Sequence, residues 1–230
     1  MQYGPKIVTD SLVLALDAAD NNSYSGSGTT WYDLTANAYN GTLTNSPTYS
    51  GTNKGYFSFD GNDDYVDIGN TTDIFPSGSQ SHSLTVSLWG KVPSTSSSTN
   101  RILYGQQNVA NERLYIGMLS GNWEFGWGAY AWGNGNSGTA AAATTDWTNL
   151  VLVIGNGVAD LYVNGVATIS KTDTSVNLQG KHPIGAYYYL NSFDANVSNV
   201  CSVAQCLMYT DALSATEVLQ NYNATKSRFT

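Results

Sequence analysis

Oxygen-bearing side chains gather at residues 60–64, which read Asp-Gly-Asn-Asp-Asp. Asp60, Asn62 and Asp64 alternate as the ligands of a calcium loop do, and a hard cation such as calcium prefers several oxygen ligands. The glycine and glutamate that would complete an EF-hand loop do not follow at the required spacing. The segment therefore predicts a calcium site of another type, with Asp60, Asn62 and Asp64 as its ligands.

Residues 56–69, which must position these side chains, read as two short β-like runs around an acidic turn. Phe57 and Phe59 fall on one face of the first run, and Val66 and Ile68 fall on one face of the second. Asp, Asn and Gly favour tight turns because they tolerate positive φ angles and bond to their own backbone. A β-hairpin with a polar tip and no metal is therefore the alternative interpretation.

Acid–base and nucleophilic catalysis find little support in the residue pattern. Glycoside hydrolysis needs two carboxylic acids that flank the scissile bond. Glu112 and Glu124 lie twelve residues apart without a nearby acidic partner, and Glu217 fits a helix cap. His82 and His182 lie outside any Gly-x-Ser-x-Gly context and do not form a zinc motif. We expect a non-catalytic protein, with glycoside hydrolysis as the least favoured alternative.

Aromatic side chains are densest at residues 123–132, where they could stack on a sugar or contact another subunit. Strand alternation places Trp123, Phe125 and Trp127 on one face, although the buried inner face of a β-sandwich would show the same pattern. Tyr130 and Trp132 follow glycines and are expected in a loop.

A second aromatic cluster lies at residues 187–189, which are three consecutive tyrosines. At least one of these rings must face outward if the segment is a strand. Carbohydrate or protein contact is therefore predicted for one set of residues: Trp127, Tyr130, Trp132, Tyr187 and Tyr189.

Composition narrows the class of protein. Charged residues make up only 11% of the 230 residues, whereas 16 Tyr and 6 Trp are present, a pattern typical of extracellular or virion β-proteins. The formal net charge of −8 argues against a nucleic acid or an anionic membrane surface as partner. The first residues lack the basic and apolar regions of a signal peptide, and no apolar run is long enough to span a membrane.

The two cysteines, Cys201 and Cys206, lie in a run that reads as one strand. In a straight strand their separation is roughly 16 Å and their odd spacing directs them to opposite faces. A disulfide needs Cα atoms within about 7 Å, so we expect two free, buried thiols. That state fits synthesis in a reducing cytosol.

Period-two patterns predict about twelve strands. The clearest is at residues 83–92, and Asn164-Gly165 is a strong signal for a type I′ hairpin. Residues 11–18 are nearly all apolar and predict a buried strand. Helical spacing occurs only near the C-terminus, where Ser214 and Glu217 form a capping box before Ala215, Val218, Leu219 and Tyr222. The pattern predicts one all-β domain over residues 1–230, an antiparallel sandwich or jelly roll with a helix at about residues 214–226.

The order and spacing of these segments resemble the laminin-G-like, concanavalin A-like lectin/glucanase jelly-roll superfamily. The matching segments cover most of the chain: residues 12–18, 31–34, 40–43, 59–66, 84–89, 147–151, 161–166, 208–217 and 220–222. The resemblance implies two antiparallel sheets packed face to face, and many members hold a calcium ion at an edge of the sandwich. The family's glucanases place their catalytic acids on one strand, a pattern that is absent here.

The opening strand together with Trp31-Tyr32-Asp33-Leu34 is similar to single-domain forms in tailed-phage structural proteins. In the following loop Ala36 and Ala38 replace the family's glycines. The resemblance implies a virion protein made in the host cytoplasm, a fibre, decoration or tail-associated component. It would act through homo-oligomer and virion-protein contacts, with a cell-surface glycan as a further partner. A stand-alone carbohydrate-binding, lectin-like module is the alternative function.

Overall fold

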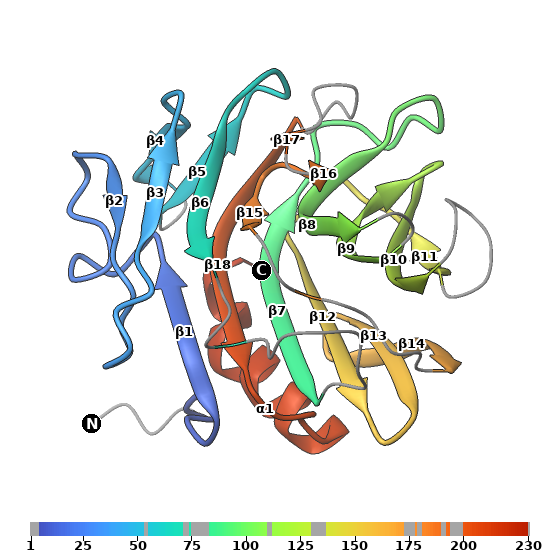
Figure 1. Cartoon of the computed structure of the whole chain (residues 1–230). Coiled ribbons are helices and arrows are strands. Elements are labelled where there is room, and N and C mark those ends of the chain that lie inside the picture. Colours follow the sequence, from blue (N-terminus) through green and yellow to red (C-terminus); the bar gives the residue numbers. More distant parts are fainter. Residues whose placement is uncertain are drawn as a thin grey trace.

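The computed structural model describes residues 5–52, 55–70, 74, 83–109, 112–129, 137–172, 178, 181–189, 192–193 and 200–229 (Figure 1). For residues 70, 107–109, 112, 127–129, 137–138, 189 and 192–193 it describes only the backbone. Two β-sheets, called sheet A and sheet B below, pack against each other (Figure 1). The helix α1 covers part of the outer face of sheet A (Figure 1). The predicted antiparallel, concanavalin A-like sandwich with a short C-terminal helix is confirmed.

Sheet A has eight strands in the described part of the chain, in the order β14-β13-β12-β7-β18-β5-β4, with β1 also pairing with β18. Its strands are β1 (Leu12–Asp17), β4 (Thr48–Ser50), β5 (Tyr56–Phe59), β7 (Leu84–Lys91), β12 (Thr148–Gly155), β13 (Val158–Val163), β14 (Val166–Thr172) and β18 (Cys201–Tyr209). All of these pairs are antiparallel.

Sheet B has ten strands among the described residues, in the order β11-β10-β9-β8-β15-β6-β3-β2, with β16 also pairing with β8 and β17 pairing with β16. Its strands are β2 (Thr30–Trp31), β3 (Gly41–Thr44), β6 (Tyr65–Asn70), β8 (Arg101–Val109), β9 (Glu112–Leu119), β10 (Asn122–Ala129), β11 (Ser137–Ala142), β15 (Lys181–Ile184), β16 (Tyr188–Tyr189) and β17 (Ser192–Phe193). The β16–β8 pair is parallel.

The main core lies between the sheets and collects the inward-facing half of each strand. On β7 it takes Leu84, Val86 and Leu88, whereas Thr85, Ser87 and Trp89 face the outer side. Trp123 and Phe125 of β10 also lie in this core, so their face is the buried inner one. Alternation with period two thus gives each strand one face toward the core, as the sequence predicts.

Residues 56–69 do not form a hairpin, which corrects the sequence-based interpretation. β5 pairs in sheet A and β6 pairs in sheet B, so the acidic turn between them crosses from one sheet to the other. Phe57 and Phe59 therefore face Val66 and Ile68 across a shared core. The same turn residues and the same alternation serve a hairpin or a crossing, and the pairing of distant strands decides between them.

Cys201 and Cys206 are both free and buried, as predicted, but they do not face opposite sides. Both lie in the core between the sheets, because the register of β18 shifts between Val203 and Gln205. This β-bulge adds one residue and so reverses the alternation along the strand.

Helix α1 (Ala215–Thr225) begins with the predicted capping box, in which the Ser214 side chain accepts from the Glu217 backbone N–H. It is followed by the short 3₁₀ helix η2 (Lys226–Arg228). Asn164 and Gly165, with φ angles of 52° and 79°, form the turn between β13 and β14, as a type I′ turn requires. In the described part of the chain, no helix is long and apolar enough to cross a membrane.

Candidate functional site

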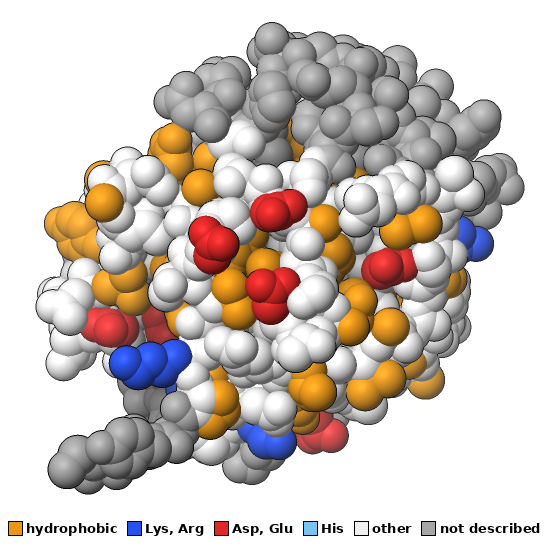
Figure 2. All heavy atoms as spheres, turned by 90° about the horizontal axis from the view of Figure 1, so that it is seen from below, with side chains coloured by type: hydrophobic (Ala, Val, Ile, Leu, Met, Phe, Trp, Pro, Cys, Tyr) orange, Lys and Arg blue, Asp and Glu red, His pale blue; other side chains and the backbone are white. Residues whose placement is uncertain are grey.

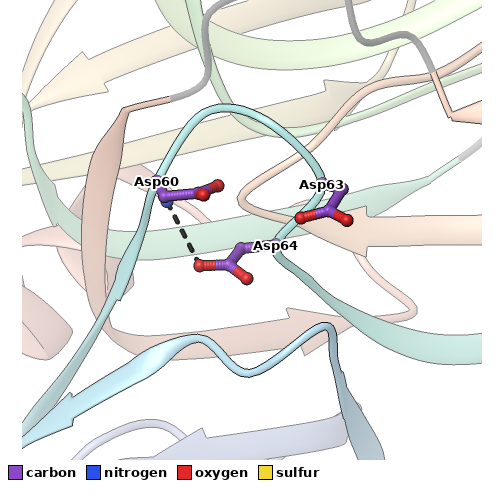
Figure 3. Close-up of side chains that lie close together, drawn as sticks. All are labelled: Asp60, Asp63 and Asp64. Carbon is purple, nitrogen blue, oxygen red and sulfur yellow. Dashed lines mark hydrogen bonds between the residues drawn. The ribbon is translucent and has the colours of Figure 1, made fainter.

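The acidic turn lies where the chain crosses between the sheets, and three of its carboxylates approach one another (Figure 3). One oxygen from each of Asp60, Asp63 and Asp64 lies within 4.8 Å of the others. Asp60 and Asp63 are exposed, whereas Asp64 is buried. The Asp64 Oδ2 atom accepts a hydrogen bond from the Asp60 backbone N–H at 3.3 Å. These oxygens fit the ligand preference of a hard cation such as calcium.

The electrostatics of this turn differ between its acids. Two hydrogen bonds of 2.8 Å from the backbone and side-chain amides of Asn62 lower the pKa of Asp60. Burial, together with the nearby charges of Asp60 and Asp63, raises the pKa of Asp64. Asn62 thus turns its amide nitrogen toward Asp60, while Asp63 supplies the third carboxylate. Asp63 therefore joins Asp60 and Asp64, two of the three predicted ligands, as a further carboxylate.

The aromatic residues predicted for recognition are only partly visible. Tyr130 and Trp132 lie outside the described residues, as do the side chains of Trp127 and Tyr189. Tyr187 is fully buried in a small cluster with Ile102, Tyr115 and Leu119 on the outer side of sheet B. Because Tyr187 is buried, neither face of its ring is open to stacking on a sugar.

A surface groove of about 410 Å³ lies instead on sheet A, where β5 and β7 end and β18 begins. Tyr56, Ser58, Lys91 and Ser202 project into it from β5, β7 and β18, and the neighbouring loops complete its walls. The Ser58 and Ser202 hydroxyls lie 2.9 Å apart and form one hydrogen bond. The groove thus combines an aromatic ring, hydroxyl groups and one ammonium group.

The aromatic side of the groove continues beyond its lining. Tyr56 and Trp147 meet edge to face with ring centroids 5.3 Å apart. Trp147 packs in turn against Phe229, which stacks on Trp89 at 4.2 Å. Tyr56 and Trp147 are half-buried, so this chain of rings fixes their orientation while part of their surface meets solvent.

The alternation of residues in β5 already indicates part of this groove. Because Phe57 and Phe59 face the core, alternation requires Tyr56 and Ser58 to face outward. What the sequence alone does not supply is the pairing of β5 with β18, which brings Ser202 beside Ser58.

The glutamates considered for catalysis are engaged in other contacts where the structure describes them. Glu124 is 8% exposed and accepts a hydrogen bond of 2.7 Å from the Tyr115 hydroxyl. Burial, together with this contact, raises the pKa of Tyr115, since both favour its neutral form. Glu217 closes the capping box of α1, and the side chain of Glu112 lies outside the described part of the chain.

The described histidine, His182, is a buried structural residue. Its Nδ1 atom lies 2.7 Å from the Tyr104 hydroxyl, and its Nε2 atom lies 2.7 Å from the Leu178 carbonyl oxygen. Because a carbonyl only accepts, Nε2 carries the proton and Nδ1 accepts from Tyr104. Burial lowers the pKa of His182 to about 4. His82 lies outside the described residues.

Figure 2 shows the molecule from below the view of Figure 1, and acidic side chains lie there among apolar ones. A second groove, of about 310 Å³, lies between the start of α1 and the β12–β13 hairpin and is lined by Tyr162, Leu213, Asp160 and Glu217. The Glu217 carboxylate accepts from the Ser214 backbone and hydroxyl at 2.8 and 2.7 Å. This second groove is therefore acidic, but the Glu217 carboxylate, one of its two acids named here, is already bound in the helix cap.

Solved structures of low sequence identity share the fold of this chain. The receptor-binding domain of botulinum neurotoxin D aligns with a TM-score of 0.68 at 16% identity, over 93% of this chain and 52% of that one. A Trypanosoma rangeli sialidase aligns with a TM-score of 0.70 at 12% identity, over 99% of this chain and 37% of that one. The binding domain of Paraclostridial Mosquitocidal Protein 1 gives 0.65 at 17% identity, over 93% and 52%.

These values establish a shared fold, and the chain spans about half of the toxin domains and about a third of the sialidase. The comparison with curated protein sequences gave no match. A sequence profile of the concanavalin A-like lectin/glucanases superfamily matches residues 60–219, which is more than half of the chain. The matched segment runs from the acidic turn through all the later strands that the structure describes and into α1. The chain belongs to the concanavalin A-like lectin/glucanase superfamily.

Proposed function

We propose that this chain is a non-catalytic adhesion domain that binds carbohydrate in the groove at Tyr56, Ser58, Lys91 and Ser202. The observation that carries the proposal is the pairing of an oriented, half-exposed aromatic edge with hydroxyl groups in one groove of about 410 Å³. Sugars present apolar C–H faces and polar hydroxyl rims, and a groove with both kinds of group matches them. Lectin-like membership and binding-domain neighbours support this class of ligand.

The absence of catalysis is part of the proposal. Glu124 is buried against Tyr115, and Glu217 is bound by its capping interactions. Neither lies in the groove described above. A glycoside hydrolase holds two acids on opposite sides of the bond that it cleaves, so these two placements favour binding without turnover.

The setting that we propose is the surface of a tailed-phage particle. This part rests on the similarity of residues 11–18 and 31–34 to phage structural proteins. It predicts a regular homo-oligomer or stable capture by other virion proteins, whereas a stand-alone lectin-like module would bind sugar as a monomer. Light scattering on the purified chain tests for the oligomer, and co-purification with other virion proteins tests for capture. A monomer that none of them captures would contradict the virion setting.

A glycan array tests the carbohydrate proposal directly. Wild-type protein should bind one group of glycans, and Tyr56→Ala should lose that binding because it removes the aromatic edge of the groove. Tyr32→Ala is the matched control, since Tyr32 is 52% exposed and does not line the groove. Absence of binding by the wild type, or equal loss in the two variants, would contradict the proposal.

A further inference from the structure

Lys91 is the charged group of the groove. It ends β7, and alternation directs its side chain to the outer side of sheet A, beyond Trp89. Its Nζ atom lies 5.0 Å from the centroid of the Tyr56 ring and 5.0 Å from that of Trp147. Two aromatic rings therefore fix the position of this ammonium group.

No carboxylate pairs with Lys91 among the residues that the structure describes. The ion pairs found there join Lys181 to Asp67 and Arg228 to Asp17. The chain has 17 acidic and only 9 basic residues, so acidic partners for a lysine are plentiful. A cation–π contact attracts an ammonium group but accepts no conventional hydrogen bond at its N–H groups. The Lys91 N–H donors thus remain available to an anionic ligand.

Hydroxyl groups complete the arrangement. Ser58 and Ser202 lie in the same groove and bond to each other at 2.9 Å. In such a pair one hydroxyl donates and the other keeps its own proton for a further acceptor. An ammonium group and a free hydroxyl proton side by side are suited to the two oxygens of a carboxylate, while the Tyr56 edge suits an adjacent sugar ring.

We infer that Lys91 makes the groove selective for sugars that carry a carboxylate, such as uronic or sialic acids. The inference rests on the proposed carbohydrate binding and adds the charge of the ligand. Because the chain carries a net charge of −8, long-range attraction does not favour such a sugar. Selectivity must come from the short contact with Lys91, where desolvated charges interact most strongly.

Titration calorimetry with two acidic probes tests the inference: sialyllactose and a galacturonic acid tetramer, each beside its neutral methyl ester. An acid that binds in the groove should bind at least about tenfold more tightly than its ester, the size of one charge-assisted hydrogen bond. Lys91→Gln should erase this difference, Lys91→Arg should retain it, and rising salt should weaken only the acid. Lys171→Gln, on β14 at the far edge of sheet A, is the charge-matched control and should leave the difference unchanged.

Three results would overturn the inference. The first is equal affinity for acid and ester. The second is an acid preference that survives Lys91→Gln. The third is a wild type that binds neutral glycans on the array but neither acidic probe, which refutes the charge preference while the proposed function stands. A wild type that binds no glycan of any kind refutes the proposed function itself. Melting temperatures of all variants verify that they are folded.

Discussion

Trp89 donates its indole N–H to the Thr225 hydroxyl at 2.8 Å, and this bond joins the centre of sheet A to the last residue of α1. Both side chains are buried. The Thr225 hydroxyl in turn donates a hydrogen bond of 2.9 Å to the Asn221 carbonyl oxygen. The outer face of the sheet therefore holds the helix through a defined polar bond as well as through apolar contact.

Removing this hydroxyl should destabilise the fold. Thr225→Val keeps the shape of the side chain but leaves the buried indole N–H of Trp89 without an acceptor, at a cost of about 1–3 kcal/mol. Urea denaturation should show that loss in the free energy of unfolding. In the Trp89→Phe background the same change should cost less, because no donor remains; equal costs in both backgrounds would contradict the coupling.

Stability should fall with acid as His182 titrates. Burial lowers its pKa from 6.5 to about 4, so the unfolded chain binds a proton in this window and the folded chain does not. The stabilisation is complete above pH 6.5 and is lost as pH falls to about 4, by about 3 kcal/mol. Unfolding free energies of wild type and His182→Gln across this range should converge by that amount; a constant difference would contradict the buried neutral form.

Gly185 should tolerate no side chain. Its φ angle is +79°, and an added Cβ would lie 2.4 Å from the Phe59 ring, which is itself packed in the core. Gly185→Ala should cost about 3 kcal/mol through strain and overpacking. Gly157 has the same φ of +79° with nothing within 4 Å, so Gly157→Ala isolates the backbone part at about 1 kcal/mol. Thermal denaturation of both variants checks the difference, and equal losses would show that Phe59 moves aside.

We propose that the acidic turn binds calcium through Asp60, Asp63 and Asp64. A calcium concentration about a hundredfold above the dissociation constant should stabilise the protein by about 3 kcal/mol over a chelated sample. Asp63→Asn should reduce that rise in melting temperature. Asp146→Asn, a change at an exposed acid outside the turn, should leave it intact. The absence of any rise in the wild type would refute the site.

The sandwich could be predicted from sequence because alternation and turn residues are local signals. Val86 and Leu88 identify the inner face of β7, and Asn164-Gly165 identifies a turn that needs two positive φ angles. Local signals do not reveal which distant strands pair. That is why the segment from Phe57 to Ile68 suggested a hairpin although it connects the two sheets.

The buried face of α1 was also predicted only in part from the sequence. Its apolar spacing predicted Leu219 on the buried stripe, yet Leu219 is 45% exposed. The buried side chains include Val218, Asn221 and Thr225 instead. Asn221 is buried because it accepts from the Val8 backbone at 2.7 Å and donates to the Tyr209 hydroxyl at 3.0 Å. Polar residues become core residues when distant partners satisfy them, and those partners are invisible to a periodic pattern.

In the candidate site, too, local sequence signals could be recognised, whereas contacts between distant residues could not. The acidic turn could be located from composition, whereas the approach of the Asp63 carboxylate to Asp60 and Asp64 required the geometry. The groove needed the pairing of β5 with β18, which places Ser58 and Ser202 together although they are 144 residues apart.

Strand β18 gives this fold a particular order of assembly. It lies between β7 on one side and both β5 and β1 on the other, yet it follows all the other described strands of sheet A in sequence. During synthesis, β7 on one side and β1 and β5 on the other therefore keep the edges that pair with β18 unpaired until residues 201–209 leave the ribosome. Closure then joins segments almost two hundred residues apart, such as Leu12 and Tyr209, and such long-range pairing is slow. The nascent chain is thus most exposed to aggregation just before its final strand arrives.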